Sequence, residues 1–227
     1  MSDVEERFPL FPLGLVMLPT EVVPLHIFEE RYKLMIGSCI EDDTEFGIVW
    51  LAEGGLREVG CTARVSQVLE RMEDGRMNIL VRGGRPFRLL RRIEDLPYPA
   101  GDVELLDDGE ESVADGARTA RERYAELVER VTDERPDTDD LAGLDAYGMA
   151  STLDFELDAK QGLLELRSEE RRLERLSELF TATLAGIERA EVAAERARGN
   201  GRMAPEAGHE HEPEVESSEP GSSERER

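Results

Sequence analysis

A run of uncharged, largely apolar residues near the N-terminus limits most strongly what this chain can fold into. The stretch Phe8–Tyr32 (FPLFPLGLVMLPTEVVPLHIFEERY) carries no charged side chain before Glu21. It contains four prolines, at Pro9, Pro12, Pro19 and Pro24. Proline lacks a backbone N–H and biases the preceding residue toward an extended conformation, so this stretch cannot form one continuous helix. Its charge-free part is also shorter than the roughly 20 residues of a membrane-spanning helix. We expect strands and turns that the rest of the chain, or a partner, buries.

From Ile27 onward the spacing of the apolar residues becomes helical. Phe28, Tyr32, Met35 and Ile36 follow one another at intervals that place them on one helix face, with charged residues between them. The pattern therefore predicts a strand, a turn, a second strand and then a short helix that begins near Ile27.

Several short apolar or alternating segments come next, separated by glycine and proline. They predict strands at Phe46–Leu51, Val59–Leu69, Asn78–Val81, Phe87–Arg91 and around Val103–Leu106. Short strands at this spacing favour a small barrel or sandwich over a parallel sheet. Trp50 lies in a segment that is apolar on both faces, so we expect it in the core.

Turn signals join these strands. Asp74-Gly75, between two alternating runs, predicts a tight hairpin turn with positive φ. Gly83-Gly84 and Pro86 are expected to interrupt the returning strand before it resumes at Phe87.

After Asp107 the pattern is helical. We predict a helix over Val113–Val131 with Ser112 as N-cap, a shorter one over Leu141–Leu153 and a third over Asp158–Leu166. Ser168 is expected to cap a last helix, whose apolar face carries Leu173, Leu176, Phe180, Leu184 and Ile187. Four such helices predict a bundle. The fold class is then α+β, with a β-rich domain at 1–107, a helical bundle at 108–198 and a disordered acidic tail at 199–227.

The charge of the chain excludes some functions. It has 52 acidic and 28 basic residues and a net charge of −24. Nucleic acids and anionic membranes bind through Lys and Arg, so we expect neither as a partner. The acidic N-terminus lacks an apolar signal segment, and the two cysteines, Cys39 and Cys61, have no metal-site spacing. These features indicate a cytoplasmic protein with reduced, partly buried thiols.

Several of these segments, in this order, resemble the N-terminal, substrate-binding domain of the Lon protease family. They are PLFPL, LP, PLHIFEERY, FGIV, GCTARV, DGR followed by VRGGRPFRLL, AKQGLLEL and SEERRLERLSELF, over roughly residues 7–190. The resemblance implies a PUA-like β pseudo-barrel that is followed by helices. It also implies that the chain binds polypeptide substrates.

The sequence shows neither the ATPase motif nor the protease motif of that family. A phosphate-binding loop needs GxxxxGK[ST], and neither Lys33 nor Lys160 follows a glycine-rich loop. Neither lysine has the surroundings of a desolvated base for a Ser-Lys pair. The tail sequence His209-Glu210-His211 lacks the further ligands of a metal site. We expect a substrate-binding module that is not an enzyme and has no catalytic residue, cofactor or metal.

One basic cluster stands out, formed by Arg82, Arg85, Arg88, Arg91 and Arg92. One interpretation is that these arginines pair with the protein's own excess of carboxylates. The other is that some of them line a groove for a peptide backbone or carboxylate. His26 lies at a strand-to-helix junction, where a structural role with a hydrogen bond to the backbone is expected. The candidate binding residues are Arg82, Arg85, Phe87, Arg88 and His26.

Three functional hypotheses follow. The first is a non-catalytic polypeptide-binding module, an adaptor or holdase, that engages unfolded or exposed segments and has a protease or chaperone as a candidate partner. In that hypothesis the negative charge steers basic chains, and extended clients pair with a free strand edge. The second is a small-molecule binder or an enzyme that reuses the fold. The third, an RNA-binding use, is disfavoured by the charge.

Overall fold

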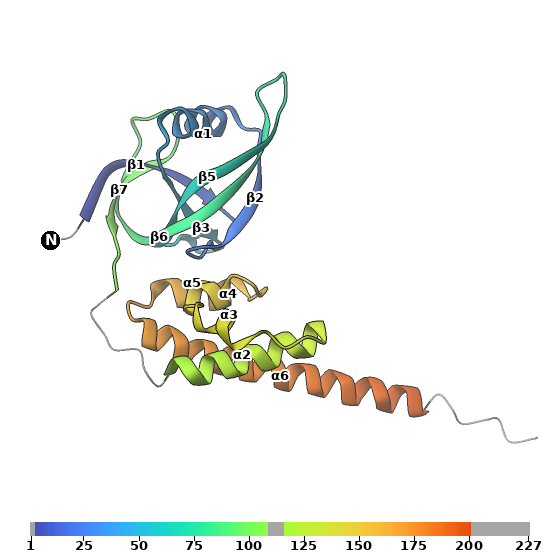
Figure 1. Ribbon diagram of the computed structural model, residues 1–227. Helices are drawn as coiled ribbons and strands as arrows, with labels where there is room; N and C mark the ends of the chain where they lie inside the picture. Colours follow the sequence, from blue (N-terminus) through green and yellow to red (C-terminus); the bar gives the residue numbers. More distant parts are fainter. Residues whose placement is uncertain (1–2, 109–115, 201–227) are drawn as a thin grey trace, which may run out of the picture. The chain divides into compact units, whose positions relative to one another are not determined.

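The computed structural model describes residues 3–108 and 116–200 (Figure 1). The first range contains one helix, α1 (Glu30–Asp42), and seven strands. The strands are β1 (Asp3–Leu13), β2 (Val22–Ile27), β3 (Phe46–Ala52), β4 (Gly55–Leu56), β5 (Val59–Arg71), β6 (Met77–Ile93) and β7 (Ala100–Leu105). The second range contains α2 (Gly116–Thr132), α3 (Thr138–Ala142), α4 (Ala146–Ala150), α5 (Leu157–Glu165) and α6 (Glu169–Asn200). The chain divides into two compact units after Gly186, within α6.

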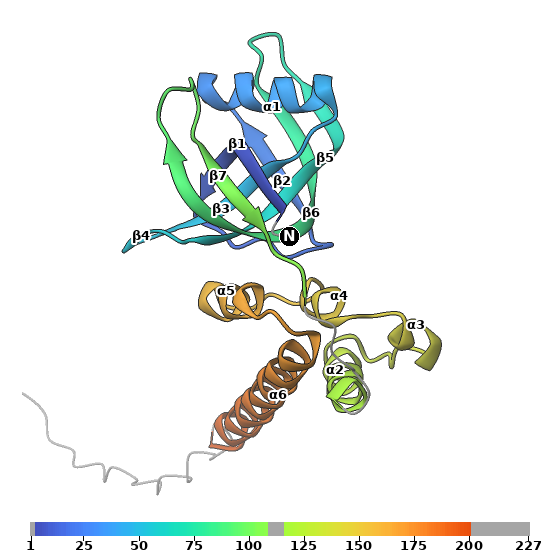
Figure 2. The ribbon, with the colours of Figure 1, turned by 90° about the vertical axis from the view of Figure 1, so that its left-hand side faces the viewer.

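Five of the strands close into a ring. They are hydrogen-bonded in the order β1-β7-β6-β5-β3, and β1 also pairs with β3. This closing pair is parallel and joins Leu10–Leu13 to Gly47–Trp50, whereas the other pairs are antiparallel. β2 pairs with the first half of β6, and β4 forms a short hairpin with β3 (Figure 2). The predicted α+β class, a β pseudo-barrel followed by helices, is confirmed.

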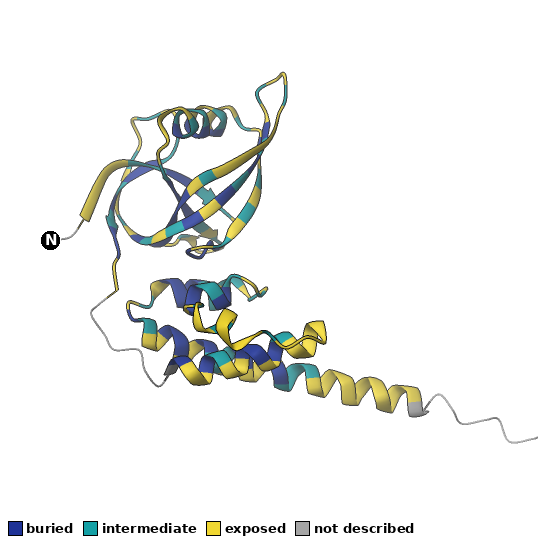
Figure 3. Ribbon diagram, viewed as in Figure 1, coloured by how far each residue is buried: buried dark blue, intermediate teal, exposed yellow. Residues whose placement is uncertain are grey.

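The barrel interior is built around Phe87 of β6. Its ring is fully buried and belongs to one core cluster with Leu10 of β1, Val49 of β3 and Val103 and Leu105 of β7. Along the strands of the barrel, buried positions alternate with exposed ones (Figure 3). Glycines on the neighbouring strands make room for it, because a Cβ on Gly60 would lie 2.6 Å from the ring. The core therefore requires one large side chain and small residues opposite it.

The predicted hairpin turn forms at Asp74-Gly75. Gly75 has φ 81°, and the Met72 N–H donates to the Arg76 carbonyl over 2.8 Å. Asp74 accepts the backbone N–H of Arg76, which lowers the pKa of its carboxyl. Here a local sequence signal is sufficient, because the turn chemistry lies within a few residues.

The predicted break in the returning strand is wrong, since β6 is continuous from Met77 to Ile93. The pairing of β6 with β5 shifts register between Cys61 and Ala63. Between these two residues, the hydroxyl oxygen of buried Thr62 accepts the backbone N–H of Arg85 over 2.9 Å. A Cβ on Gly83 would collide with the Leu18 carbonyl. These glycines thus permit a bulge and a close backbone crossing rather than ending the strand.

Two sequence-based predictions for the barrel region differ from the structure: where the first helix begins and how far Trp50 is buried. The helix begins at Glu30 instead of Ile27, because Ile27 still pairs with Met77 at the end of β2. Phe28 therefore precedes the helix and is 58% exposed. Trp50 is only half-buried, and its ring lies 5.0 Å from the guanidinium of Arg57.

The helical region follows the predicted pattern except in one segment. The single helix expected over Leu141–Leu153 is two short helices, α3 and α4, because Gly143 ends the first and Asp145 caps the second by accepting the Gly148 N–H at 2.6 Å. On α6, the predicted face is buried from Leu173 to Leu184, and Ile187 is half-buried. The predicted cap Ser112 and the tail from residue 201 lie outside the described residues.

Polar contacts join α5 to the barrel. Lys160 Nζ lies 2.6 Å from Glu21 Oε1 in the loop between β1 and β2, and both side chains are largely buried. The Gln161 amide donates to the Val59 carbonyl over 3.1 Å. Among the described helices, none combines the length and apolar character needed to cross a bilayer.

Candidate functional site

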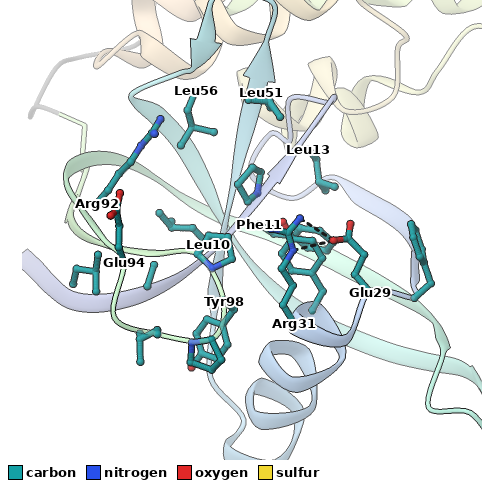
Figure 4. Close-up of a pocket in the computed structure, with 18 of the residues that line it drawn as sticks. Leu10, Phe11, Leu13, Glu29, Arg31, Leu51, Leu56, Arg92, Glu94 and Tyr98 are labelled. Atoms are coloured by element: carbon teal, nitrogen blue, oxygen red, sulfur yellow. Dashed lines mark hydrogen bonds and ion pairs between the residues drawn. The ribbon is translucent and has the colours of Figure 1, made fainter.

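The barrel carries a groove of about 780 Å³ on its outer side. Five segments form its walls: the end of β1, the end of β2, the start of α1 with the residues just before it, the tip of the β3–β4 hairpin and the connection from β6 to β7 (Figure 4). Apolar side chains dominate the lining, among them Leu10, Phe11, Pro12, Leu13, Phe28, Leu51, Leu56, Ile93, Leu96, Pro97, Tyr98 and Pro99.

Buried residues support the floor, and exposed ones form the edges. Phe11 is buried and lies 4.1 Å, centroid to centroid, from the ring of Tyr32 on α1. Phe28 and Leu51 are 58% and 54% exposed and line the groove from opposite segments. Exposed apolar side chains around a concave apolar floor are typical of a binding surface.

Charged groups flank this apolar floor on two sides. Glu29 and Arg31 lie on one side and Arg92 and Glu94 on the other (Figure 4). Arg31 forms an ion pair of 2.8 Å with Glu29, and its guanidinium lies 4.6 Å from the centroid of the Tyr32 ring. With two acidic and two basic residues, the groove is formally neutral, although the whole chain carries −24.

Of the predicted binding residues, His26 is the one that lines the groove. It is exposed, its Nδ1 is hydrogen-bonded to Asn78 Oδ1 at 2.6 Å, and its ring stacks on Phe28 with 5.8 Å between centroids. The prediction that His26 forms a hydrogen bond to the backbone is therefore wrong, because its partner is the side chain of Asn78. This contact orients His26 and Phe28 at one edge of the groove.

The structure places the other predicted binding residues elsewhere. Arg85 pairs with Asp3 at 3.3 Å and Asp107 at 3.4 Å, and Arg88 with Glu104 at 4.0 Å. Arg82 donates to the carbonyl of Thr20 over 3.3 Å. Phe87 is fully buried in the barrel core, where a ligand at the surface does not reach it. Arg85 and Arg88, and Arg91 with Asp102 at 2.6 Å, thus match the interpretation that the arginines pair with the chain's own carboxylates. Arg92 instead lines the groove, as the other interpretation expects of some of them.

Apart from Arg92 of the basic cluster, the groove residues outside the Phe8–Tyr32 segment were not predicted. Leu51 and Leu56 border a glycine turn, and Leu96–Pro99 lies in a connection that was assigned no element. The only sequence signal was that these turns carry leucine, tyrosine and proline in place of the usual polar residues.

Besides apolar side chains and arginines, the described groove lining contains His26, two glutamates and two tyrosines. Of the described residues that line it, none is Ser, Thr, Cys or Lys, the side chains that most often serve as nucleophiles. Within residues 3–108 and 116–200, no group of three or more His, Cys, Asp and Glu is placed to hold a metal ion. Both cysteines are buried, and burial raises the pKa of the Cys61 thiol.

Comparison with known proteins yields one family. The family model of the ATP-dependent protease La (LON) substrate-binding domain matches residues 7–182. Lon protease 2 of Herpetosiphon aurantiacus is 29% identical over an alignment of 203 residues, and the match covers 80% of this chain and 24% of that protein. Lon protease 1 of Syntrophobacter fumaroxidans is 28% identical over 191 residues, with 74% and 23% covered. The chain spans less than a quarter of the length of these two relatives.

Solved structures show the same fold. A Lon N-terminal domain protein from Xanthomonas campestris has a TM-score of 0.59 at 25% identity and covers 74% of this chain and 95% of its own. The N-terminal domain of the Mycobacterium avium complex Lon protease also has a TM-score of 0.59, at 21% identity, with 79% and 98% covered. The second likeness is one of fold alone.

Proposed function

Because the chain belongs to the family of ATP-dependent protease La (LON) substrate-binding domains, we propose that it binds polypeptides without modifying them. Exposed apolar segments of unfolded chains would be taken into the groove on the barrel. The family match supports a substrate-binding role, and the groove supports apolar segments as the substrate.

The observation that carries this proposal is the pair of exposed side chains at the groove. Phe28 and Leu51 expose more than half of their surface next to the buried floor around Phe11. Apolar surface in water is unfavourable, at about 25 cal/mol per Å². A ligand with apolar side chains would remove this surface from water, whereas folding of the chain alone leaves it exposed.

The net charge of the chain affects how fast such a ligand associates. A field of −24 charges attracts basic polypeptides over about 8–10 Å at physiological salt. We propose that it raises the association rate of basic clients, while the neutral groove leaves the lifetime of the complex independent of charge. A cytoplasmic location and a protease or chaperone as partner remain part of the proposal.

The test uses two leucines that match in type and exposure. Leu51, in the groove, is 54% exposed, and Leu69, on β5 outside the groove, is 51% exposed. Binding of a reduced, alkylated basic protein to the full chain is measured by fluorescence anisotropy. A fully buried leucine contributes about 1.5–3 kcal/mol, so partial burial of Leu51 gives Leu51→Ser an affinity loss of about tenfold. Leu69→Ser should bind as the parent does. Equal losses in both variants, or none in either, would contradict the groove as the binding site.

The groove volume also supports a second candidate, a small apolar ligand. A space of about 780 Å³ lies within the range of roughly 300–1,000 Å³ that ligand sites occupy. If small apolar compounds displace a fluorescent probe from the groove, and polypeptides neither bind nor displace it, this second function replaces the first.

A further inference from the structure

We propose that the groove recognises the side chains of its ligand and forms no strand pairing with the ligand's backbone, so it accepts apolar segments in either chain direction. This inference rests on the proposed function and adds the mode of recognition. It concerns the backbone groups that border the groove.

The β1 edge of the groove lacks the N–H that strand pairing requires. The N–H of Leu10 points away from β3 and donates to the Pro99 carbonyl over 2.8 Å. Backbone groups of successive strand residues point to opposite edges, so those of residue 12 face the same side as those of Leu10. Residue 12 is a proline and has no N–H to offer. The other edge of β1 is already paired with β3, from Leu10↔Gly47 to Leu13↔Trp50.

Two of the remaining walls also contain proline, and the hairpin edge is short. In the connection between β6 and β7, Pro97 and Pro99 also lack an N–H, and the segment has no regular strand geometry. The hairpin of β3 and β4 pairs only Leu51 with Leu56 and Ala52 with Gly55. An added strand needs alternating donors and acceptors over several residues. β2 contributes His26 to the groove and pairs on one edge only, with β6, and Pro24 removes one N–H from this strand. Prolines therefore reduce the backbone donors of three of the segments that border the groove.

The charged groups give no direction to a ligand either. Each of the two flanks carries one acidic and one basic residue, Glu29 with Arg31 and Glu94 with Arg92. A bound segment therefore meets a similar charge pattern at both ends. The expectation that extended clients pair with a free strand edge does not apply at this groove. What remains for recognition is apolar contact with side chains such as Phe28 and Leu51.

The test compares two peptides that differ in their backbone and share their side-chain arrangement. The first is a short, uncharged L-peptide with leucine and phenylalanine at its centre and serine at both ends. The second is its retro-inverso form, made of D-residues in reversed order. That form keeps the side chains in nearly the same places while amide N–H and C=O groups exchange positions. Dissociation constants are measured with the full chain by calorimetry, and again with Leu51→Ser and Leu69→Ser.

Side-chain recognition predicts that the two peptides bind within about threefold of each other, and that Leu51→Ser weakens both by the same factor. If the L-peptide binds and the retro-inverso form binds more than about tenfold more weakly, backbone recognition is shown and the inference is overturned, while the proposed function stands. Binding of the retro-inverso form that Leu51→Ser does not weaken also overturns it. If neither peptide binds, the proposed function fails as well.

Discussion

Replacing Lys160 by methionine should destabilise the protein strongly, because Lys160 joins α5 to the barrel. Its Nζ lies 2.6 Å from Glu21 Oε1, and the two side chains are only 12% and 14% exposed. Glu21 is held in place, since its other oxygen accepts the Leu18 N–H at 2.9 Å. Methionine keeps the apolar stem of the side chain and removes the charge, which leaves the Glu21 carboxylate poorly solvated and without its cation.

The expected loss follows from burial. Removing one partner of a buried ion pair costs about 3–5 kcal/mol. The residual exposure and the remaining hydrogen bond of Glu21 reduce this to about 2–3 kcal/mol. In a chain of this size, each kcal/mol shifts the Tm by about 2–4 °C, so Tm should fall by about 4–12 °C. The measurement is thermal unfolding of the full chain, followed by circular dichroism.

An exposed ion pair provides the matched control. Arg118 and Glu122 on α2 are 3.9 Å apart and 80% and 63% exposed. Arg118→Met should change Tm by no more than about 4 °C, because exposed pairs contribute about 0–1 kcal/mol. Adding Glu21→Gln to Lys160→Met should restore part of the loss, since the unpaired carboxylate is removed. Equal effects of Lys160→Met and Arg118→Met, or a double variant less stable than Lys160→Met, would refute the reasoning.

Three further outcomes are expected. Gly60→Ala should lower the free energy of unfolding by about 1–3 kcal/mol in urea titrations, because its Cβ would lie 2.6 Å from the ring of Phe87. Adding Phe87→Leu to this variant should recover part of the lost stability. If Gly60→Ala does not lower the stability, the core is packed more loosely than the structure shows. Asp102 accepts a backbone N–H and an arginine side chain, which lower the pKa of its carboxyl below the usual 3.8. The stability it provides is therefore present above that value and is lost as pH falls through the lowered pKa, so Asp102→Asn should reduce Tm at neutral pH and match the parent in strong acid. Burial raises the thiol pKa of Cys39 and Cys61, so neither should react with a thiol-specific disulfide reagent at pH 8 until the protein unfolds, and rapid native reaction would contradict the burial.

The sequence was sufficient where the determining contacts are local. The turn at Asp74-Gly75 depends on residues within it, and the Gly75 φ of 81° is what that pair favours. The helices α5 and α6 follow the spacing of their own apolar residues, which is fixed by the helix period. The order of short strands before helices likewise predicted the α+β class.

Only the tertiary structure decided features that depend on distant neighbours. In the sequence Gly83-Gly84 predicts a break, yet the strand continues, paired with β5 on both sides of the glycines. Gly83 leaves room there for the carbonyl of Leu18, which is distant in sequence. The sequence leaves open whether the arginines of β6 contact a ligand. In the structure Arg85 and Arg88 pair with carboxylates of β1 and β7, whereas Arg92 lines the groove.

The groove was the least predictable feature. It combines five segments that lie up to 90 residues apart, from Leu10 to Ala100. Its exposed apolar side chains, such as Phe28 and Leu51, come from different segments, and a single exposed leucine is unremarkable in any sequence. Closure of the ring by pairing of β1 with β3 brings these side chains together. The position of the groove is therefore set by the pairing of strands that are distant in sequence, whereas local residue patterns determine where each strand forms.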